Sequence, residues 1–264
     1  MDFYFDRRVS SSARWARRVA IFSLVLLLTA GAGHRYGAVE TIPFFWVLVI
    51  VAALAVLALL LAAWGFFRLW TRGDQAGRAA TRATLVSLLV LALFAFGGYR
   101  AYTLPRLTEV TTDTADPPRF ETAMGRRPSD ANPIGTVTPE HARLQLAAYP
   151  AVSGRRYAQP IDRLGEIVAF VLASLGWPVA YHSDPQLSAG EIRIEAVAQS
   201  RVFGLVSDVI IRLVDEGEST YVDLRSNSRY GPHDLGDNAE KVLRFIGALD
   251  EEVALRNRPV NILD

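Results

Sequence analysis

The chain has 264 residues, of which 51% are hydrophobic and 21% are charged, with 28 Lys or Arg residues against 27 Asp or Glu residues. It contains no cysteine, which excludes disulfide bonds, thiolate metal sites and a cysteine nucleophile. The near-zero net charge hides two unlike halves: residues 1–104 hold 11 Arg and four acidic residues, whereas the remainder holds 17 basic and 23 acidic residues. Because nucleic-acid phosphates are bound by clustered Lys and Arg, the acidic second half argues against nucleic acid as a partner.

Three apolar runs predict that residues 1–104 are a membrane anchor, with transmembrane helices near residues 17–38, 43–68 and 82–103. The middle run, Pro43 to Phe67, is 25 uncharged residues, and a water-soluble helix of that length would show a polar face. The third run lies between Arg82 and Arg100, whose side chains can reach the headgroups. No Asp, Glu or Lys falls within a run, so an anchor is expected rather than an ion or proton path.

The first apolar run, Val19 to Gly33, leaves two interpretations open: a retained short helix, or a signal peptide cleaved near Ala30-Gly31-Ala32. Five arginines precede it: Arg7, Arg8, Arg14, Arg17 and Arg18. Four more lie between the second and third runs, and only Arg35 lies between the first two. The positive-inside rule therefore predicts a cytoplasmic N-terminus in a bacterial inner membrane and a periplasmic C-terminal domain.

Residues 105–137 are rich in Thr, Asp, Pro and Gly, and they predict an extended tether or a strap over the following domain. Residues 138–264 predict a soluble α+β domain, an antiparallel sheet of about four strands with two or three packed helices. Helices are expected over residues 139–148, over residues 160–175 and from an N-cap at Asp234. Strands are expected over residues 178–182, 191–196, 206–214 and 220–226.

Polar residues gather where the last predicted strand leaves the sheet, and the neighbouring strands carry charges at alternating positions. The candidate ligand-binding residues are Arg193, Asp208, Arg212, Asp223, Arg225, Ser226, Ser228, Arg229, Gly231, Asp234, Gly236 and Asn238. One interpretation is an anion or headgroup site, with Arg225 and Arg229 as bidentate donors beside the helix start at Asp234. The other is structural: Arg229 pairs with Asp234 or Asp237, and the amide and glycines of the loop hold its turn.

Catalytic and metal chemistry finds less support in the sequence. His233 next to Asp234, with Ser226 or Ser228 nearby, supplies the residue types of a nucleophile, base and acid, but adjacent residues rarely face one another. No nucleophile-elbow pattern surrounds either serine. No pair of histidines has metal-ligand spacing and no glycine-rich phosphate loop occurs, so neither a metal nor a cofactor is expected.

Residues 225–238 read Arg-Ser-x-Ser-Arg-x-Gly-x-x-Asp-x-Gly-x-Asn, and residues 203–212 before them read Phe-Gly-Leu-Val-Ser-Asp-Val-Ile-Ile-Arg. Together they resemble the family catalogued as domain of unknown function 1499, over about Val110 to Leu249. The resemblance implies an envelope-associated bacterial protein and carries no established activity. Many members have an Asn-Cys segment ahead of the domain, whereas this chain has Asn132-Pro133 and no Cys.

These observations predict a membrane-anchored periplasmic module that is non-enzymatic and binds a ligand or a partner. The alternative is a periplasmic hydrolase or transferase that uses His233, Asp234 and a nearby serine, and the question of an enzyme stays open. The expected partners are the lipid bilayer, an anionic or headgroup ligand and an envelope protein.

Overall fold

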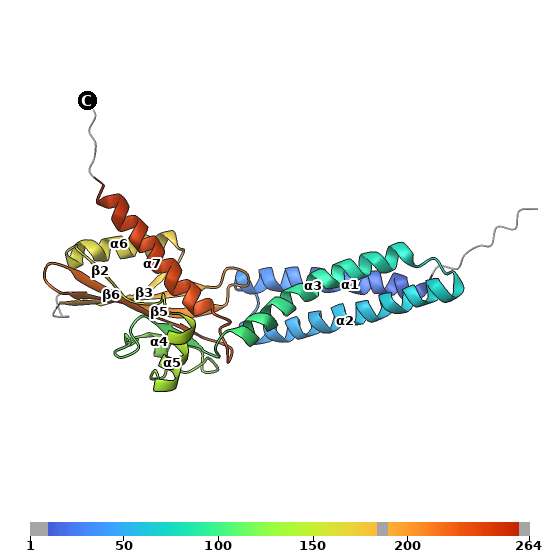
Figure 1. Ribbon diagram of the computed structural model, residues 1–264, viewed down its shortest axis with the longest axis horizontal. Coiled ribbons are helices and arrows are strands. Elements are labelled where there is room, and N and C mark those ends of the chain that lie inside the picture. Colours follow the sequence, from blue (N-terminus) through green and yellow to red (C-terminus); the bar gives the residue numbers. More distant parts are fainter. Residues whose placement is uncertain (1–9, 184–189, 259–264) are drawn as a thin grey trace, which may run out of the picture. The chain divides into compact units, whose positions relative to one another are not determined.

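A computed structural model describes residues 10–183 and 190–258, which belong to two compact units (Figure 1). The first unit comprises residues 1–99 with 202–204, and the second comprises residues 100–201 and 205–264. Arg7 and Arg8, two of the arginines that predict a cytoplasmic N-terminus, lie outside the described residues. Residues 184–189 and 259–264 of the predicted soluble domain also lie outside them.

Three helices, each long and apolar enough to cross a membrane, confirm the predicted apolar anchor: α1 (Ser11–Arg35), α2 (Thr41–Arg72) and α3 (Gly77–Thr103). Helix α1 begins earlier than predicted because the hydroxyl of Ser10 accepts a hydrogen bond from the amide of Ala13 and caps it. The helices meet through small side chains. A Cβ atom on Gly65 would lie 3.2 Å from that of Ala13, so α1 and α2 can approach closely only because both residues are small.

The second unit is an α+β domain with an antiparallel six-stranded sheet, which confirms the predicted fold class with more strands than predicted. The strands are β1 (Glu109–Thr111), β2 (Arg155–Tyr157), β3 (Val179–His182), β4 (Glu191–Gln199), β5 (Val206–Asp215) and β6 (Thr220–Ser228). The sheet order is β1-β6-β5-β4-β3, and β2 also pairs with β6. The helices are α4 (Ala123–Arg126), α5 (Pro139–Ala148), α6 (Ile161–Ser174) and α7 (Asp237–Arg256).

Helices α6 and α7 cover one face of this sheet (Figure 1). In register, Ile194, Ile211 and Leu224 lie side by side on the three long strands and are fully buried. Leu164 of α6 and Phe245 of α7 are fully buried in the same core. Each such side chain contributes about 1.5–3 kcal/mol through burial, so this apolar layer accounts for much of the stability of the domain.

Residues 112–137, here called the strap, cross the other face of the sheet. Of the two predictions for residues 105–137, a tether or a strap over the domain, the structure agrees with the strap. Strand β1 pairs with residues 225–227 of β6, and the strap contacts β4, β5 and β6. Phe120 and Ile134 of the strap pack with Ile210 of β5 in a small second apolar cluster. Most of the other side chains on this face are polar or charged, among them Arg193, Glu195, Asp208, Arg212, Asp223, Arg225 and Asn227.

Helix α7 begins at Asp237, so the predicted N-cap at Asp234 is wrong. Gly236 is the residue before the helix and has a φ of 78°, a left-handed conformation that favours glycine. Asp234 nevertheless accepts the amide hydrogen of Asn238, at 3.1 Å, and so satisfies a donor in the first turn from outside the helix.

Candidate functional site

The alternation of β6 divides the predicted site residues between the two faces of the sheet. Ser226 and Ser228 bond to Asn238 of α7. Arg225 bonds instead to the strap, through the carbonyl oxygen of Gly135. The structure therefore does not bring the predicted arginines together with the start of α7, because the two lie on opposite faces.

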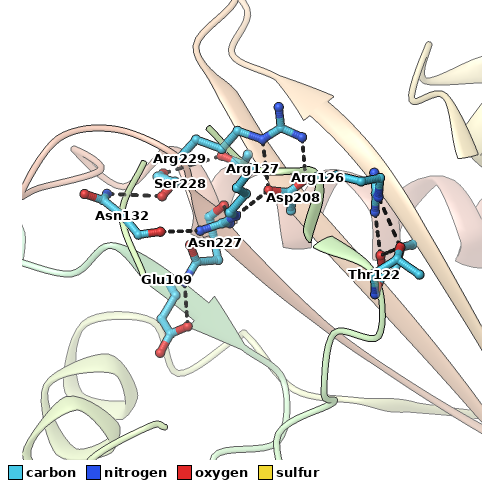
Figure 2. A network of polar contacts seen from close by, with 11 residues as sticks. Glu109, Thr122, Arg126, Arg127, Asn132, Asp208, Asn227, Ser228 and Arg229 are labelled. Carbon is cyan, nitrogen blue, oxygen red and sulfur yellow. Dashed lines mark hydrogen bonds and ion pairs between the residues drawn. The ribbon is translucent and has the colours of Figure 1, made fainter. Parts of the chain in front are cut away.

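Asp208 is the centre of the polar network on the strap face (Figure 2). Its Oδ2 accepts from Nε of Arg127 at 2.7 Å and from Nε of Arg229 at 2.9 Å, and its Oδ1 accepts from Nη2 of Arg229 at 2.7 Å. Only 1% of the Asp208 side chain is exposed. Burial lowers the pKa of Arg127, whereas the hydrogen bonds that Arg229 donates to Asp208 raise the pKa of Arg229.

The predicted pairing of Arg229 with Asp234 or Asp237 is therefore wrong. Asp208 lies opposite Asn227 in the β5–β6 register, and Arg229 projects to the same face as Asn227. The prediction pairs Arg229 with the carboxylates nearest to it in the sequence. The pleat of the sheet instead places Arg229 beside Asp208, 21 residues away.

Asn132 fastens the strap to the end of β6 (Figure 2). Its side-chain amide donates to the carbonyl oxygens of Ser228 at 3.1 Å and of Gly231 at 2.8 Å. Its backbone amide donates to the carbonyl oxygen of Arg229 at 2.6 Å. Gly231 has a φ of 89°, which allows the turn that presents its carbonyl. Asn132 thus binds the backbone of the Arg-Ser-x-Ser-Arg-x-Gly motif, a role that the sequence analysis missed.

Arg225 is held in a buried ion pair with Glu109 of β1. Its Nε and Nη2 lie 3.0 and 2.5 Å from Oε2 of Glu109, which also accepts from Asn227 at 2.8 Å. Nη2 donates to the carbonyl of Gly135 as well, at 2.6 Å. Glu109 is 5% exposed, so removing either partner would leave a buried charge.

The predicted Arg193 and its β4 neighbour Glu195 are also paired on this face. Glu195, fully buried, accepts from the Thr122 hydroxyl at 2.6 Å and from Nη2 of Arg126 at 2.5 Å (Figure 2). Arg193 pairs with Glu191 on its own strand and with Glu121 of the strap. Most of the cations here neutralise carboxylates of the domain itself, which is the behaviour of a structural network.

Two neighbouring depressions nevertheless open beside the strap. The first, here called the strap groove, has a volume of about 650 Å³, and its lining includes Phe120, Met124, Ile134, Arg119 and Arg225. The second has about 510 Å³, and Arg193 and Arg212 are part of its lining. Asp116, Arg119 and Phe120 line both. Three of the predicted arginines therefore reach surface hollows from their places in the network.

A second polar network lies under α7. Asn238 donates to Ser228 Oγ and to the carbonyl of Thr108, both at 2.9 Å, and accepts from Ser226 Oγ at 2.7 Å. One turn further on, Nζ of Lys241, the single lysine of the chain, donates to Ser207 Oγ at 2.7 Å. A serine beside a lysine whose pKa is lowered by burial is a pairing that some hydrolases use. Here Ser207 and Lys241 are 1% and 2% exposed, so a substrate has no access to them.

The predicted His233, Asp234 and serine set is not assembled. Nδ1 of His233 accepts the amide hydrogen of Leu235 at 2.9 Å, whereas a catalytic histidine donates from Nδ1 to its carboxylate. Asp234 Oδ1 lies 3.8 Å from that nitrogen and accepts instead from the amide of Gly236 at 2.9 Å. Burial raises the pKa of Asp234, against the backbone hydrogen bonds that lower it.

Within residues 10–183 and 190–258, no three His, Cys, Asp or Glu side chains lie close enough to hold a metal ion. The buried carboxylates of Glu109, Glu195, Asp208 and Asp223 instead accept hydrogen bonds from arginine.

A family model described as Protein of unknown function (DUF1499) matches residues 109–249. The match starts at the first residue of β1 and ends within α7, so it includes the strap and the whole sheet. A comparison with curated proteins found no match.

Proposed function

Since this chain belongs to the family described as Protein of unknown function (DUF1499), we propose from its geometry that it is a membrane-anchored, non-enzymatic binding module. The proposed ligand is an anionic amphipathic molecule that occupies the strap groove. An envelope protein that presents such a group is the related possibility.

The anchor and its orientation supply the first part of the proposal. Three apolar helices support attachment to a membrane. The arginine distribution supports an N-terminus in the cytoplasm and a domain in the periplasm, attached to a bacterial inner membrane. The ligand would therefore be a molecule of the cell envelope.

The chemistry of the strap groove carries the second part. Phe120, Met124 and Ile134 offer an apolar wall, and the guanidinium of Arg119 lies at the same hollow. Met124 is 63% exposed, so its apolar side chain is accessible to a ligand at this hollow. An apolar surface with a few polar groups that fix orientation is the usual composition of a ligand site. The charged residues of this lining are Arg119, Arg225 and Asp116, and the Asp116 carboxylate is paired with Arg212.

Arg119 rather than Arg225 is the residue to change, because Arg225 also holds Glu109. Full-length protein would be purified from native membranes as wild type, Arg119→Gln and Arg143→Gln, and the released lipids and small molecules identified by mass spectrometry. Arg143 is an exposed arginine on α5 and serves as the matched control.

We expect an anionic amphiphile with the wild type and the control, and roughly tenfold less with Arg119→Gln, the factor for one lost charge-assisted hydrogen bond. Equal amounts of ligand in all three proteins would reject the strap groove as the site. The alternative, a hydrolase or transferase that uses His233, would be supported by a measured turnover that His233→Ala abolishes.

A further inference from the structure

Three arginines from separate segments line one pocket of the second unit, with a volume of about 490 Å³. Arg100 lies in the last turn of α3, Arg201 follows β4, and Arg244 belongs to α7. The other lining residues are Tyr149, Gly236, Ala239, Glu240 and Leu243. We refer to this hollow as the arginine pocket.

The lining of the arginine pocket is positively charged. Glu240 is the one carboxylate among its lining residues, and it lies 3.9 Å from Arg100 Nη1 and 3.5 Å from Arg201 Nη1. Burial, and then the charge of Arg201, lower the pKa of Arg244, so two of the guanidiniums are close enough to repel. Cations held together around a hollow attract an anion, which relieves this repulsion.

Two polar atoms of this lining are buried without a partner. Neither Tyr149 Oη nor Arg244 Nε has a hydrogen-bond partner among the residues that the structure describes. Burial raises the pKa of Tyr149 to about 12, so its hydroxyl keeps its proton at neutral pH. Both atoms are therefore hydrogen-bond donors, and buried donors are normally satisfied by a protein group, a water or a ligand.

Gly236 allows the pocket to form against the start of α7. A Cβ atom there would lie 2.8 Å from Leu104, 2.9 Å from Arg100 Nη2 and 3.2 Å from Tyr149 Oη. Glycine is therefore needed for the close approach of Arg100 and Tyr149 to the residue that precedes α7. The dipole of this 20-residue helix adds to the preference for a negative group at that end.

We propose that the arginine pocket binds the phosphate group of an anionic phospholipid. Arg100 follows directly on the apolar part of α3, and an arginine at the end of a membrane helix reaches the level of the lipid phosphates. Guanidinium groups bind phosphate oxygens in bidentate geometry, and the Tyr149 hydroxyl supplies one more donor. The inference rests on the proposed membrane anchoring and is independent of the strap groove.

The test uses the full-length protein in nanodiscs of phosphatidylcholine with or without phosphatidylglycerol, and native mass spectrometry of the lipid that stays bound. The variants are Arg244→Gln, Tyr149→Phe and the control Arg143→Gln. Arg244 stacks over Trp177, with 5.3 Å between Cζ and the ring centroid, so Arg244→Gln could loosen the fold. Tyr149→Phe removes a single hydroxyl that bonds to no described residue, so the fold should be unchanged. This variant therefore still tests the pocket if Arg244→Gln does not fold.

We expect the wild type and the control to retain phosphatidylglycerol over phosphatidylcholine. Arg244→Gln should lower this retention by roughly tenfold or more, and Tyr149→Phe by a smaller factor. Equal retention by the wild type and both pocket variants would overturn the proposal. Binding of sn-glycerol 3-phosphate without retention of phosphatidylglycerol would overturn the lipid assignment and show a site for a soluble phosphate ester. Arg119→Gln is measured in parallel: loss of phosphatidylglycerol with Arg119→Gln, and none with Arg244→Gln or Tyr149→Phe, would place the lipid in the strap groove and overturn this proposal.

Discussion

Arg212 and Asp223 lie directly opposite each other on β5 and β6, and the guanidinium binds both carboxylate oxygens, Nε to Oδ1 at 3.0 Å and Nη2 to Oδ2 at 2.6 Å. Nη1 of the same arginine binds Asp116 of the strap at 2.7 Å. The pair thus joins two strands to the segment that covers them. Asp208 and Glu195 of the sheet likewise bind Arg127 and Arg126 of the strap. Ion pairs thus join the strap to β4, β5 and β6.

Asp208→Ala is expected to destabilise the protein strongly, by about 3–5 kcal/mol in the free energy of unfolding. The substitution leaves Arg127 and Arg229 without the carboxylate that neutralises both. Denaturant unfolding of the full-length chain in detergent, followed by near-ultraviolet circular dichroism, would measure the loss. Glu216→Gln is the control, because the ion pair of Glu216 with Arg156 is exposed. This substitution should leave the midpoint of denaturant unfolding unchanged. Similar midpoints for both variants would contradict a structural role for Asp208.

Asp234 should make stability depend on pH in the acidic range. Burial raises its pKa in the folded state above the unfolded value of about 3.9, so the folded protein binds the proton more tightly. The resulting stabilisation is fully present below the unfolded pKa and is lost as the pH rises through the folded pKa. The wild type should therefore lose stability relative to Asp234→Asn over that window, as measured by unfolding at a series of pH values. The opposite slope would mean that the amides of Gly236 and Asn238 outweigh burial.

Lys241 should resist amine-reactive reagents until the domain opens. It is the only lysine, so peptide mapping distinguishes its modification from that of the chain's α-amino group. Burial lowers its pKa, which by itself would speed the reaction by increasing the neutral amine. The 2% exposure of Lys241 acts in the opposite direction. If opening of the domain costs about 3 kcal/mol, labelling of the native protein should be roughly a hundredfold slower than that of the denatured chain. Labelling of the native protein as fast as that of the denatured chain would contradict this packing.

The absence of cysteine makes the proposed orientation testable with single substitutions. Glu218→Cys places a thiol in the exposed β5–β6 turn, and Gln75→Cys places one between α2 and α3. In intact spheroplasts, a membrane-impermeant maleimide should label the first and not the second. Labelling of Gln75→Cys alone would reverse the orientation.

The fold class could be predicted because its main elements carry local signals. Alternation located β4, β5 and β6 to within a few residues, since each strand has one apolar face against α6 and α7. Gly176 has the left-handed φ of 68° expected of the residue that follows α6.

The contacts of the strap could not be predicted in the same way. Its contacts with the sheet join residues about 70 to 110 positions apart, such as Arg127 with Asp208, and they follow no periodicity. Strands β1 and β2 have three residues each, too few to show alternation. The predicted residues include Asp208, Arg225 and Arg229 of the network. They do not include Glu109, Glu195 and Arg127, whose contacts depend on the pleat of the sheet and on the segment that covers it.

The pairing of β1 with β6 affects where the soluble part can be cut. A fragment that starts at residue 138 would lose the carboxylate that neutralises Arg225 and three residues that cover the edge of β6. An uncovered strand edge offers free backbone groups to other chains, so such a fragment should aggregate. Limited proteolysis should accordingly release a stable product only when cleavage falls before Leu107, whose carbonyl still accepts the amide hydrogen of Asp234.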